Sequence, residues 1–548
     1  MGYYRQNLSR LGQPVQKQTA QTMSVPASVN GINALDGLMA MQPADSIYSY
    51  NIMPSEYGLR LRLGYSQWST GALGDVRTII NYESNSSTVA DQLWAVTENG
   101  IYNVTNFGTT VPVEDVAFTV QGDAAGHGVT VEFTNDASTH YLFYADYVNG
   151  LHQYDDANGW SIPAGWTYDD PDNPGNQVAF PVADIAFITV HKLRIWVILQ
   201  DSDDAWYLPV ASVAGELKKF TFGAKMNHGG RLMGLWDWTV DGGDGVDDYM
   251  IALSKAGDLL VYRGADPEDE AWSTVGSWFI GQATQSRKVA IQYGAELYLL
   301  SSYGITSIRD LLQGSAADIA RNSPAARIAR YLRADVEVGI NRYEWSLEVH
   351  PGDGFFQVTT PEPSNTPYIQ YNQNISTKGW GIWRGVPMLC GSTWNGQYFM
   401  GGKNGVVYVY QGGLDGVTLD GSNLGAPIEF SNLTSFQSPG GHTSYKRVGF
   451  IRPIGVVAGQ VALNVDAVYD YNIEDPINSP EPIPPTAANL WDSAYWDQAS
   501  WNYSISGASL PAATLGMGRA FAVGMAGSAD TRITIVGWDV AFTAGGFL

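Results

Sequence analysis

Apolar and polar residues alternate over short runs along most of the chain, a pattern typical of half-buried β-strands. Seven times between residues 93 and 410, an apolar strand, a tight polar or glycine turn and a second aromatic or β-branched strand follow one another. The seven segments are 93–104, 141–154, 195–208, 249–262, 297–308, 355–371 and 398–410. Hairpins that recur every ~40 to 50 residues must stack on neighbours, most commonly as blades of four strands arranged radially. The pattern therefore predicts an all-β chain with a β-propeller.

The spacing of these segments bears on the number of blades, for which seven is the best estimate. The interval that ends at Tyr368 is long enough to hold an insertion, and the next interval is short for a blade, so six or eight blades stay open. Candidates for the additional strands of the blades lie at 113–122, 128–134, 182–190 and 277–282.

Changes in composition and in the pattern of apolar residues along the chain predict four parts. Residues 1–25 are a polar, flexible N-terminal arm, and 26–68 form an N-terminal docking segment of turns and short apolar runs. The propeller is expected over 69–413. A glycine-rich connector then leads into 414–548, where several strands predict a C-terminal domain resembling a β-sandwich.

One stretch, residues 318–336, predicts a helix, in which Ile328, Tyr331 and Leu332 share one face. Three arginines fall elsewhere on this helix: Arg327, Arg330 and Arg333. They either cover a solvated face or meet the acidic surface of an adjacent subunit, since arginine is favoured in interface ion pairs.

Composition agrees with strands and turns, with 61 Gly, 26 Pro and only 15% charged residues. The net charge of −24 argues against general affinity for nucleic acid. It serves either solubility or the passage of DNA past like-charged walls. The single cysteine, Cys390, permits no internal disulfide and is expected in the core, and no apolar run is long enough to span a membrane. The chain is therefore expected to be made in the cytoplasm.

Motifs for chemistry are largely missing, so no enzyme, cofactor or metal is expected. The sequence has no nucleophile elbow, phosphate-binding loop or dinucleotide fingerprint, and its histidines are scattered singly. Asp241, Asp244 and Asp247 in DGGDGVDD could form a calcium loop, but the spacing differs from an EF-hand, and an acidic hairpin turn is the preferred interpretation.

Four segments of the chain have distinctive sequences that point to one protein family. The first runs from Gly31 through Pro54 to the strand 59–65, the second is 236–281, and the third is 376–385 with 398–410. The fourth, LWDSAYWDQASWN at 490–502, repeats tryptophan every five residues. These segments are similar to the tail nozzle proteins of short-tailed bacteriophages (podoviruses).

This resemblance implies a structural protein of the virion tail. It implies a homohexameric ring below the phage adaptor and portal, in contact with tail fibres or spikes, through which DNA is ejected without sequence recognition. The C-terminal domain would narrow or gate the channel. The tryptophan repeat would dock on the chain's own β-domain or on a neighbouring subunit. Possible subunit-interface residues are Arg327, Arg330, Arg333, Trp491, Trp496 and Trp501.

Two other functions compete with this one. The chain could be a receptor-recognition propeller that binds host-surface glycans through Trp380, Trp383 and Trp394, although a role in the blade cores is the preferred interpretation for these tryptophans. It could also be a cellular propeller scaffold, which predicts a monomer.

Overall fold

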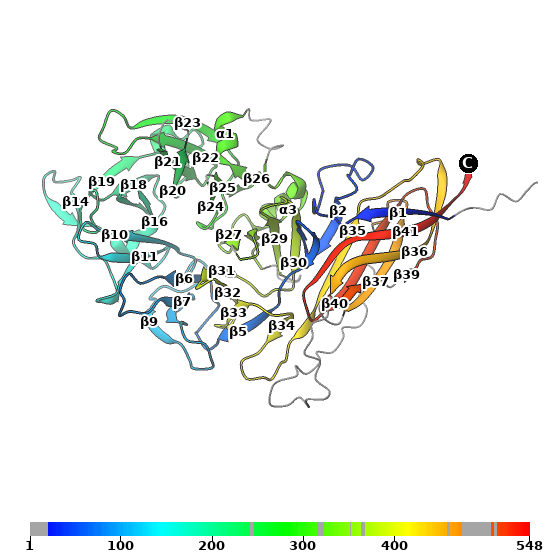
Figure 1. Cartoon of the computed structure of the whole chain (residues 1–548). Coiled ribbons are helices and arrows are strands. Elements are labelled where there is room, and N and C mark those ends of the chain that lie inside the picture. Colours follow the sequence, from blue (N-terminus) through cyan, green and yellow to red (C-terminus); the bar gives the residue numbers. More distant parts are fainter. Residues whose placement is uncertain are drawn as a thin grey trace, which may run out of the picture.

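The structure is a computed structural model, and it describes most of the chain. The described ranges are 20–241, 246–294, 296–314, 323–350, 352–362, 368–457, 461–473, 506–508 and 512–547. Strands make up nearly all of the regular structure. They form two lobes, a large ring of small sheets and a smaller β-sandwich that ends at the C-terminus (Figure 1).

The large lobe is a β-propeller of seven blades, and its innermost strands surround a common axis. These strands are β6 (Thr78–Tyr82), β10 (Val129–Thr134), β16 (Ile185–His191), β20 (Leu232–Asp241), β24 (Ala290–Tyr293), β27 (Ser346–His350) and β31 (Cys390–Trp394). The second strands are β7 (Gln92–Val96), β11 (His140–Asp146), β17 (Arg194–Leu199), β21 (Val246–Ser254), β25 (Glu296–Ser301), β28 (Phe355–Thr359) and β32 (Gln397–Gly401).

The third strands are β8 (Gly100–Asn103), β12 (Gly150–Asp155), β18 (Asp204–Tyr207), β22 (Asp258–Arg263), β26 (Gly304–Ser307), β29 (Ile369–Asn374) and β33 (Val407–Tyr410). Each pairs antiparallel with the second strand of its own blade. The seven repeated segments of the sequence are therefore the central hairpins of seven blades. The predicted all-β propeller fold is confirmed.

Outer strands complete six of the seven blades. They are β9 (Val113–Ala117), β13 (Gly159–Ser161), β19 (Gly215–Thr221), β23 (Ser273–Phe279), β30 (Trp380–Arg384) and β5 (Tyr65–Ser69). The third blade is extended by β14 (Trp166–Asp169) and β15 (Gln177–Ala179). Short 3-10 turns, Val182–Asp184 and Gly223–Lys225, lead into or out of this blade.

The fifth blade has three strands among the described residues, and helices follow them in the long interval before the sixth blade. They are α1 (Ile308–Gln313), a 3-10 turn (Ala326–Ile328) and α3 (Ala329–Gly339). The helix expected at 318–336 is thus shifted toward the C-terminus, and residues 315–322 lie outside the described part. Ile328, Leu332 and Val336 form the buried stripe, because they are spaced by four. Tyr331 lies off this stripe and is 39% exposed, contrary to expectation.

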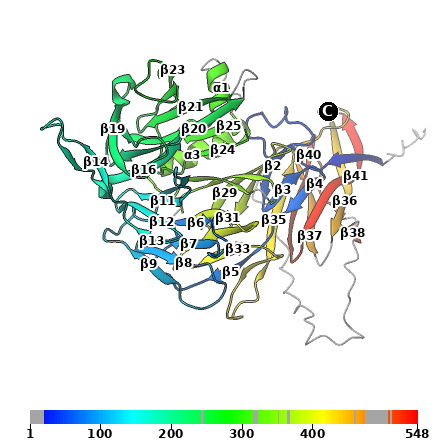
Figure 2. The ribbon, with the colours of Figure 1, turned by 60° about the vertical axis from the view of Figure 1, so that its left-hand side comes forward.

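The seventh blade is built from both ends of the propeller sequence. Its first three strands come from residues 390–410, and its outer strand is β5, which pairs antiparallel with β33 (Figure 2). Tyr65 stands opposite Tyr410, and Ser69 stands opposite Val407. This pairing closes the ring, so that neither end of the propeller leaves an open sheet edge.

The smaller lobe is a two-layer β-sandwich that also draws on both ends of the chain. One layer holds β1 (Gln21–Pro26), β3 (Ile52–Ser55), β4 (Gly58–Leu61), β36 (Ser444–Val457), β38 (Ser506–Ala508), β39 (Ala512–Ala513) and β41 (Ile533–Phe547). The other holds β2 (Ser46–Tyr50), β35 (Ala426–Thr434), β37 (Val461–Tyr469) and β40 (Phe521–Ala529). Apolar side chains of both layers, including Val25, Leu59, Phe430 and Trp538, form one buried core.

The expected docking segment, residues 26–68, is therefore no separate unit in the structure. Its strands β2, β3 and β4 are built into the sandwich, and β5 completes the last blade. Strand pairing between positions several hundred residues apart leaves no local signal, so the sequence pattern could not assign these strands to their sheets.

The two lobes are joined by a continuous sheet. The connector strand β34 (Leu414–Val417) pairs with both β5 of the propeller and β35 of the sandwich. On the sixth blade, β30 lies parallel to β2, with Tyr50 opposite Ile382. Asp353 adds an ionic joint, because its carboxylate accepts hydrogen bonds from Arg60 and Arg532 of the sandwich.

Candidate functional site

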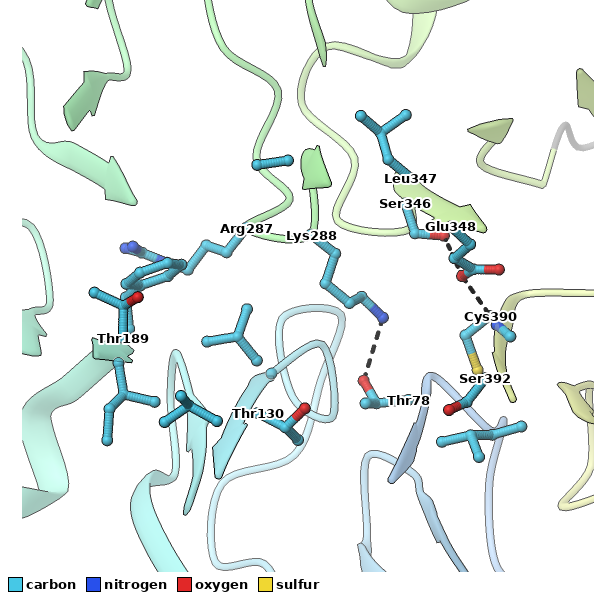
Figure 3. Close-up of a pocket in the computed structure, with 18 of the residues that line it drawn as sticks. Thr78, Thr130, Thr189, Arg287, Lys288, Ser346, Leu347, Glu348, Cys390 and Ser392 are labelled. Carbon is cyan, nitrogen blue, oxygen red and sulfur yellow. Dashed lines mark hydrogen bonds between the residues drawn. The ribbon is translucent and has the colours of Figure 1, made fainter. Parts of the chain in front are cut away.

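The axis of the propeller holds a cavity of about 340 Å³. All seven innermost strands contribute to its wall, among them β6, β16 and β27 (Figure 3). Concave sites for small ligands span roughly 300–1,000 Å³, so the axial cavity has room for a small molecule or ion. We call it the axial channel.

One side of the axial channel carries a half-buried carboxylate, Glu348. Its Oε1 accepts hydrogen bonds from the Ser346 hydroxyl at 2.8 Å and the Gly391 amide at 3.0 Å. Its Oε2 accepts one from the Tyr398 hydroxyl at 2.5 Å. Burial raises the pKa of Glu348, and these hydrogen bonds oppose the rise. Because both oxygens already have donors, this carboxylate is held by its own blade and the next.

Two cations, Arg287 and Lys288, line the channel from the segment that leads into β24. The Lys288 Nζ donates hydrogen bonds to the Arg77 carbonyl at 2.7 Å and to Thr78 Oγ1 at 3.2 Å. Arg287 is only 4% exposed, and its Nη1 donates to the Met233 carbonyl at 2.7 Å. Burial lowers the pKa of both side chains, that of Arg287 to about 10.

Above Arg287, the Tyr147 ring is shared by two guanidinium groups. Arg287 and Arg231 lie 5.4 and 5.2 Å from the ring centroid. Arg231 also pairs with Asp201, which accepts a hydrogen bond from the Tyr147 hydroxyl at 2.9 Å. The aromatic face stabilises both cations, while their mutual repulsion contributes to the lowered pKa of Arg287.

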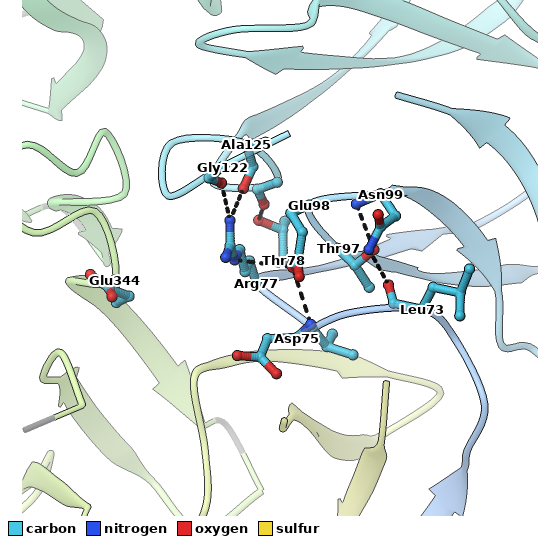
Figure 4. Close-up of polar contacts among 12 residues, drawn as sticks. Leu73, Asp75, Arg77, Thr78, Thr97, Glu98, Asn99, Gly122, Ala125 and Glu344 are labelled. Carbon is cyan, nitrogen blue, oxygen red and sulfur yellow. Dashed lines mark hydrogen bonds and ion pairs between the residues drawn. The ribbon is translucent and has the colours of Figure 1, made fainter. Parts of the chain in front are cut away.

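The rim next to the first blade is fixed by backbone contacts of Arg77. Its Nη1 donates to the carbonyls of Gly122 at 2.6 Å and Ala125 at 2.8 Å, and its Nε lies 3.5 Å from Glu98 Oε2 (Figure 4). The same Glu98 oxygen accepts the Asp75 amide at 3.1 Å. This network ties together the loops that enter the first and second blades.

The arginines expected at a subunit interface have different surroundings. Arg327 pairs within the chain, with its Nη1 2.8 Å from Oδ1 of the fully buried Asp45. The Arg333 Nε donates to the Tyr303 carbonyl at 2.9 Å. Arg330 is exposed on α3. The three tryptophans predicted with them, Trp491, Trp496 and Trp501, lie outside the described residues.

The other candidates from the sequence are placed as follows. Trp380 and Trp383 are fully buried, and Trp394 is 8% exposed, so all three pack in the propeller core. Residues 242–245 of the acidic turn, which include Asp244, lie outside the described part of the chain. Asp248, at the end of this turn, forms an ion pair with Lys192. Among the described residues, no three His, Cys, Asp or Glu side chains are grouped to hold a metal. No described helix is long and apolar enough to cross a membrane.

The axial channel was missed by sequence reasoning. Arg287 and Lys288 are adjacent cations in an acidic chain, and that doublet just before an innermost strand was the available signal. Glu348 and Tyr398 lie on different blades, so their contact depends on closure of the ring.

Comparisons with known proteins give little beyond architecture. No family model matches the chain, and no curated protein matches it. Similar solved structures include the WD40 β-propeller domain of Doa1, at 9% identity, covering 63% of this chain and 96% of that one with a TM-score of 0.35. Another is BBS1N in complex with ARL6DN, at 9% identity, covering 64% and 97% with a TM-score of 0.36.

Proposed function

We propose that this chain is a structural subunit of a phage tail, placed in the nozzle ring below the portal and adaptor. The continuous sheet from the propeller into the sandwich is the observation that best supports a mechanical role. Domains within one chain normally move against each other unless their interface is extensive. Here hydrogen-bonded strands and the ionic joint at Asp353 hold the lobes as one body, which suits a wall that bears load.

The axial channel cannot be the path of DNA in this proposal. Its volume of about 340 Å³ is that of a site for a small molecule. Double-stranded DNA needs a continuous bore wider than its own major groove, which is about 12 Å across. DNA would therefore run between copies of the chain, along the axis of the ring. The net charge of −24 would keep that lumen from binding the phosphate backbone.

The outward face of α3 is the proposed contact between copies. Arg330, Tyr331 and Val338 are exposed there, and Val338 is 90% exposed. Arginine with apolar neighbours is a common composition of interfaces. Arg327, by contrast, is withdrawn from this face by its pairing with Asp45.

Cryo-electron microscopy of the purified chain, with and without portal and adaptor, tests the proposal. A six-fold ring with a bore wide enough for duplex DNA is expected. A monomer in both conditions, or a trimer that binds glycans, would overturn it and favour the receptor-recognition alternative.

A further inference from the structure

Two neighbouring residues, Arg287 and Lys288, bring two positive charges to the axial channel, and the one carboxylate among the residues that line it is that of Glu348. Neither side chain forms a direct ion pair within the described part of the chain, although Asp201 attracts Arg287 and both Glu348 and Glu344 attract Lys288 at longer range. Their hydrogen bonds go to carbonyls and to the Thr78 hydroxyl. Buried charges are normally paired, because an isolated one loses its hydration without compensation. With two cations against one carboxylate, the lining of the channel carries an excess of positive charge in a chain that is strongly acidic overall.

Glu348 offsets only part of this excess, because it is one negative charge against two positive ones and attracts Lys288 without a direct ion pair. Its two oxygens accept hydrogen bonds from Ser346, Gly391 and Tyr398, and among the described residues it forms no direct ion pair with Lys288. Figure 3 shows the Lys288 side chain extending toward Thr78, while the hydrogen bonds of Glu348 run to other residues. The ammonium group has three donors and uses two, so one N–H is left for a ligand.

We propose that the axial channel binds a small oxyanion of the phosphate class, which contacts the Lys288 ammonium and is attracted by the Arg287 guanidinium. Lysine is a common phosphate ligand that acts as a point charge. Thr130 and Thr189 line the same channel and supply hydroxyl donors. Arg287 acts at longer range, since its unpartnered Nη2 is sealed from solvent. The inference is independent of the tail role proposed above.

The size of the channel limits the ligand to a free ion or a compact phosphate-bearing molecule. Inorganic phosphate fits easily in about 340 Å³, and so does the terminal phosphate of a mononucleotide near the rim. Both sources share the chemistry that Lys288 recognises. Inorganic phosphate, sulfate and adenosine monophosphate are therefore separate arms of the test.

The test uses the full chain in phosphate-free buffer, with ionic strength held constant by chloride. Thermal unfolding and calorimetric titration are followed as each anion is added. The expected result is a saturable rise in Tm and a measurable Kd for inorganic phosphate, for adenosine monophosphate, or for both. Lys288→Met should weaken binding by about tenfold or more, and Arg287→Met by a smaller factor. The exposed cations Lys225 and Arg447 supply the matched controls Lys225→Met and Arg447→Met, which should leave binding unchanged.

A second readout separates a lost ligand from a lost fold. Without added oxyanion, Lys288→Met should unfold at the same temperature as the wild type or higher, because it removes a charge that loses more hydration in the channel than its neighbours restore. If that variant does not fold, the test is instead made on wild-type crystals soaked in selenate. An anomalous difference peak beside Lys288 Nζ is then expected. An equal Tm rise with chloride, equal binding by Lys288→Met, or no selenate peak in the channel would each overturn the proposal.

Discussion

The Arg62 guanidinium donates two hydrogen bonds, of 2.7 and 2.6 Å, to the Asp415 carboxylate, although the two residues are 353 positions apart in the sequence. Arg62 is almost fully buried, and its Nε also donates to Asn51 Oδ1 at 3.0 Å. The pair fixes the start of the connector strand β34 against the end of β4, where propeller and sandwich meet.

Removing one partner of this pair should therefore destabilise the joint. We expect Arg62→Met to lower the free energy of unfolding by about 3 kcal/mol, because it leaves the Asp415 carboxylate without its two guanidinium donors. Equilibrium unfolding in urea measures the change. Arg452→Met is the control, since Arg452 pairs with Asp539 at the surface and should cost less than about 1 kcal/mol. Equal midpoints for the two variants would contradict this role for Arg62.

Lys255 should make the stability of the protein depend on alkaline pH. Burial, with a contribution from Arg231, lowers its pKa from 10.5 to about 8. Between these values the unfolded chain binds more protons than the folded one, so stability rises with pH across this window. Lys255→Met removes that contribution, and the difference in Tm between wild type and variant should shift in favour of the wild type from pH 8 to pH 10.5. A difference that stays constant over this range would refute the assignment.

Cys390 should be chemically silent while the protein is folded. Its side chain is 2% exposed on the wall of the axial channel, and burial raises the pKa of the thiol to about 12. Only the thiolate reacts quickly with disulfide reagents. At pH 8 we expect labelling only after unfolding, as measured by absorbance after adding an aromatic disulfide. Ser376→Cys introduces an exposed thiol as a positive control and should react at once.

The polar arm should serve assembly rather than folding. Deleting residues 2–19 leaves β1 intact, whereas a deletion to residue 25 would remove most of a strand that pairs with β41. We expect the shorter deletion to leave the Tm unchanged and to reduce incorporation into particles, measured by quantitative blotting of purified virions. Wild-type incorporation of this truncated chain would show that the arm has no docking role.

Arg330→Glu should weaken the association of copies without changing the fold, because Arg330 is exposed on α3 and the substitution reverses its charge. Sedimentation velocity measures the ring fraction. Lys225→Glu makes the same charge change at another exposed lysine and should leave association unaffected. An unaltered ring fraction for Arg330→Glu would remove α3 from the proposed interface.

Local pattern was enough to predict the blades, because each central hairpin carries its own alternation and turn residues. In the first blade, for instance, the apolar run of β7, the polar turn after it and Gly100 at the start of β8 mark both strands without tertiary information. The sheet membership of β1 to β5 could not be predicted, since every partner of these strands other than a neighbouring hairpin strand lies hundreds of residues away. The channel was missed for the same reason, because its wall exists only once seven blades close.

The closure of the last blade by β5 also governs the order in which the protein can fold. Residues 65–69 leave the ribosome early, but their partner β33 is synthesised more than 330 residues later, and β41 is made last of all. At roughly 5–20 residues per second, these N-terminal strands wait for tens of seconds without their final neighbours. Unpaired strand edges are sites of aggregation during that delay. The chain is therefore most prone to aggregate while it is being translated. Expression at a lower temperature, or together with chaperones, should raise its soluble yield.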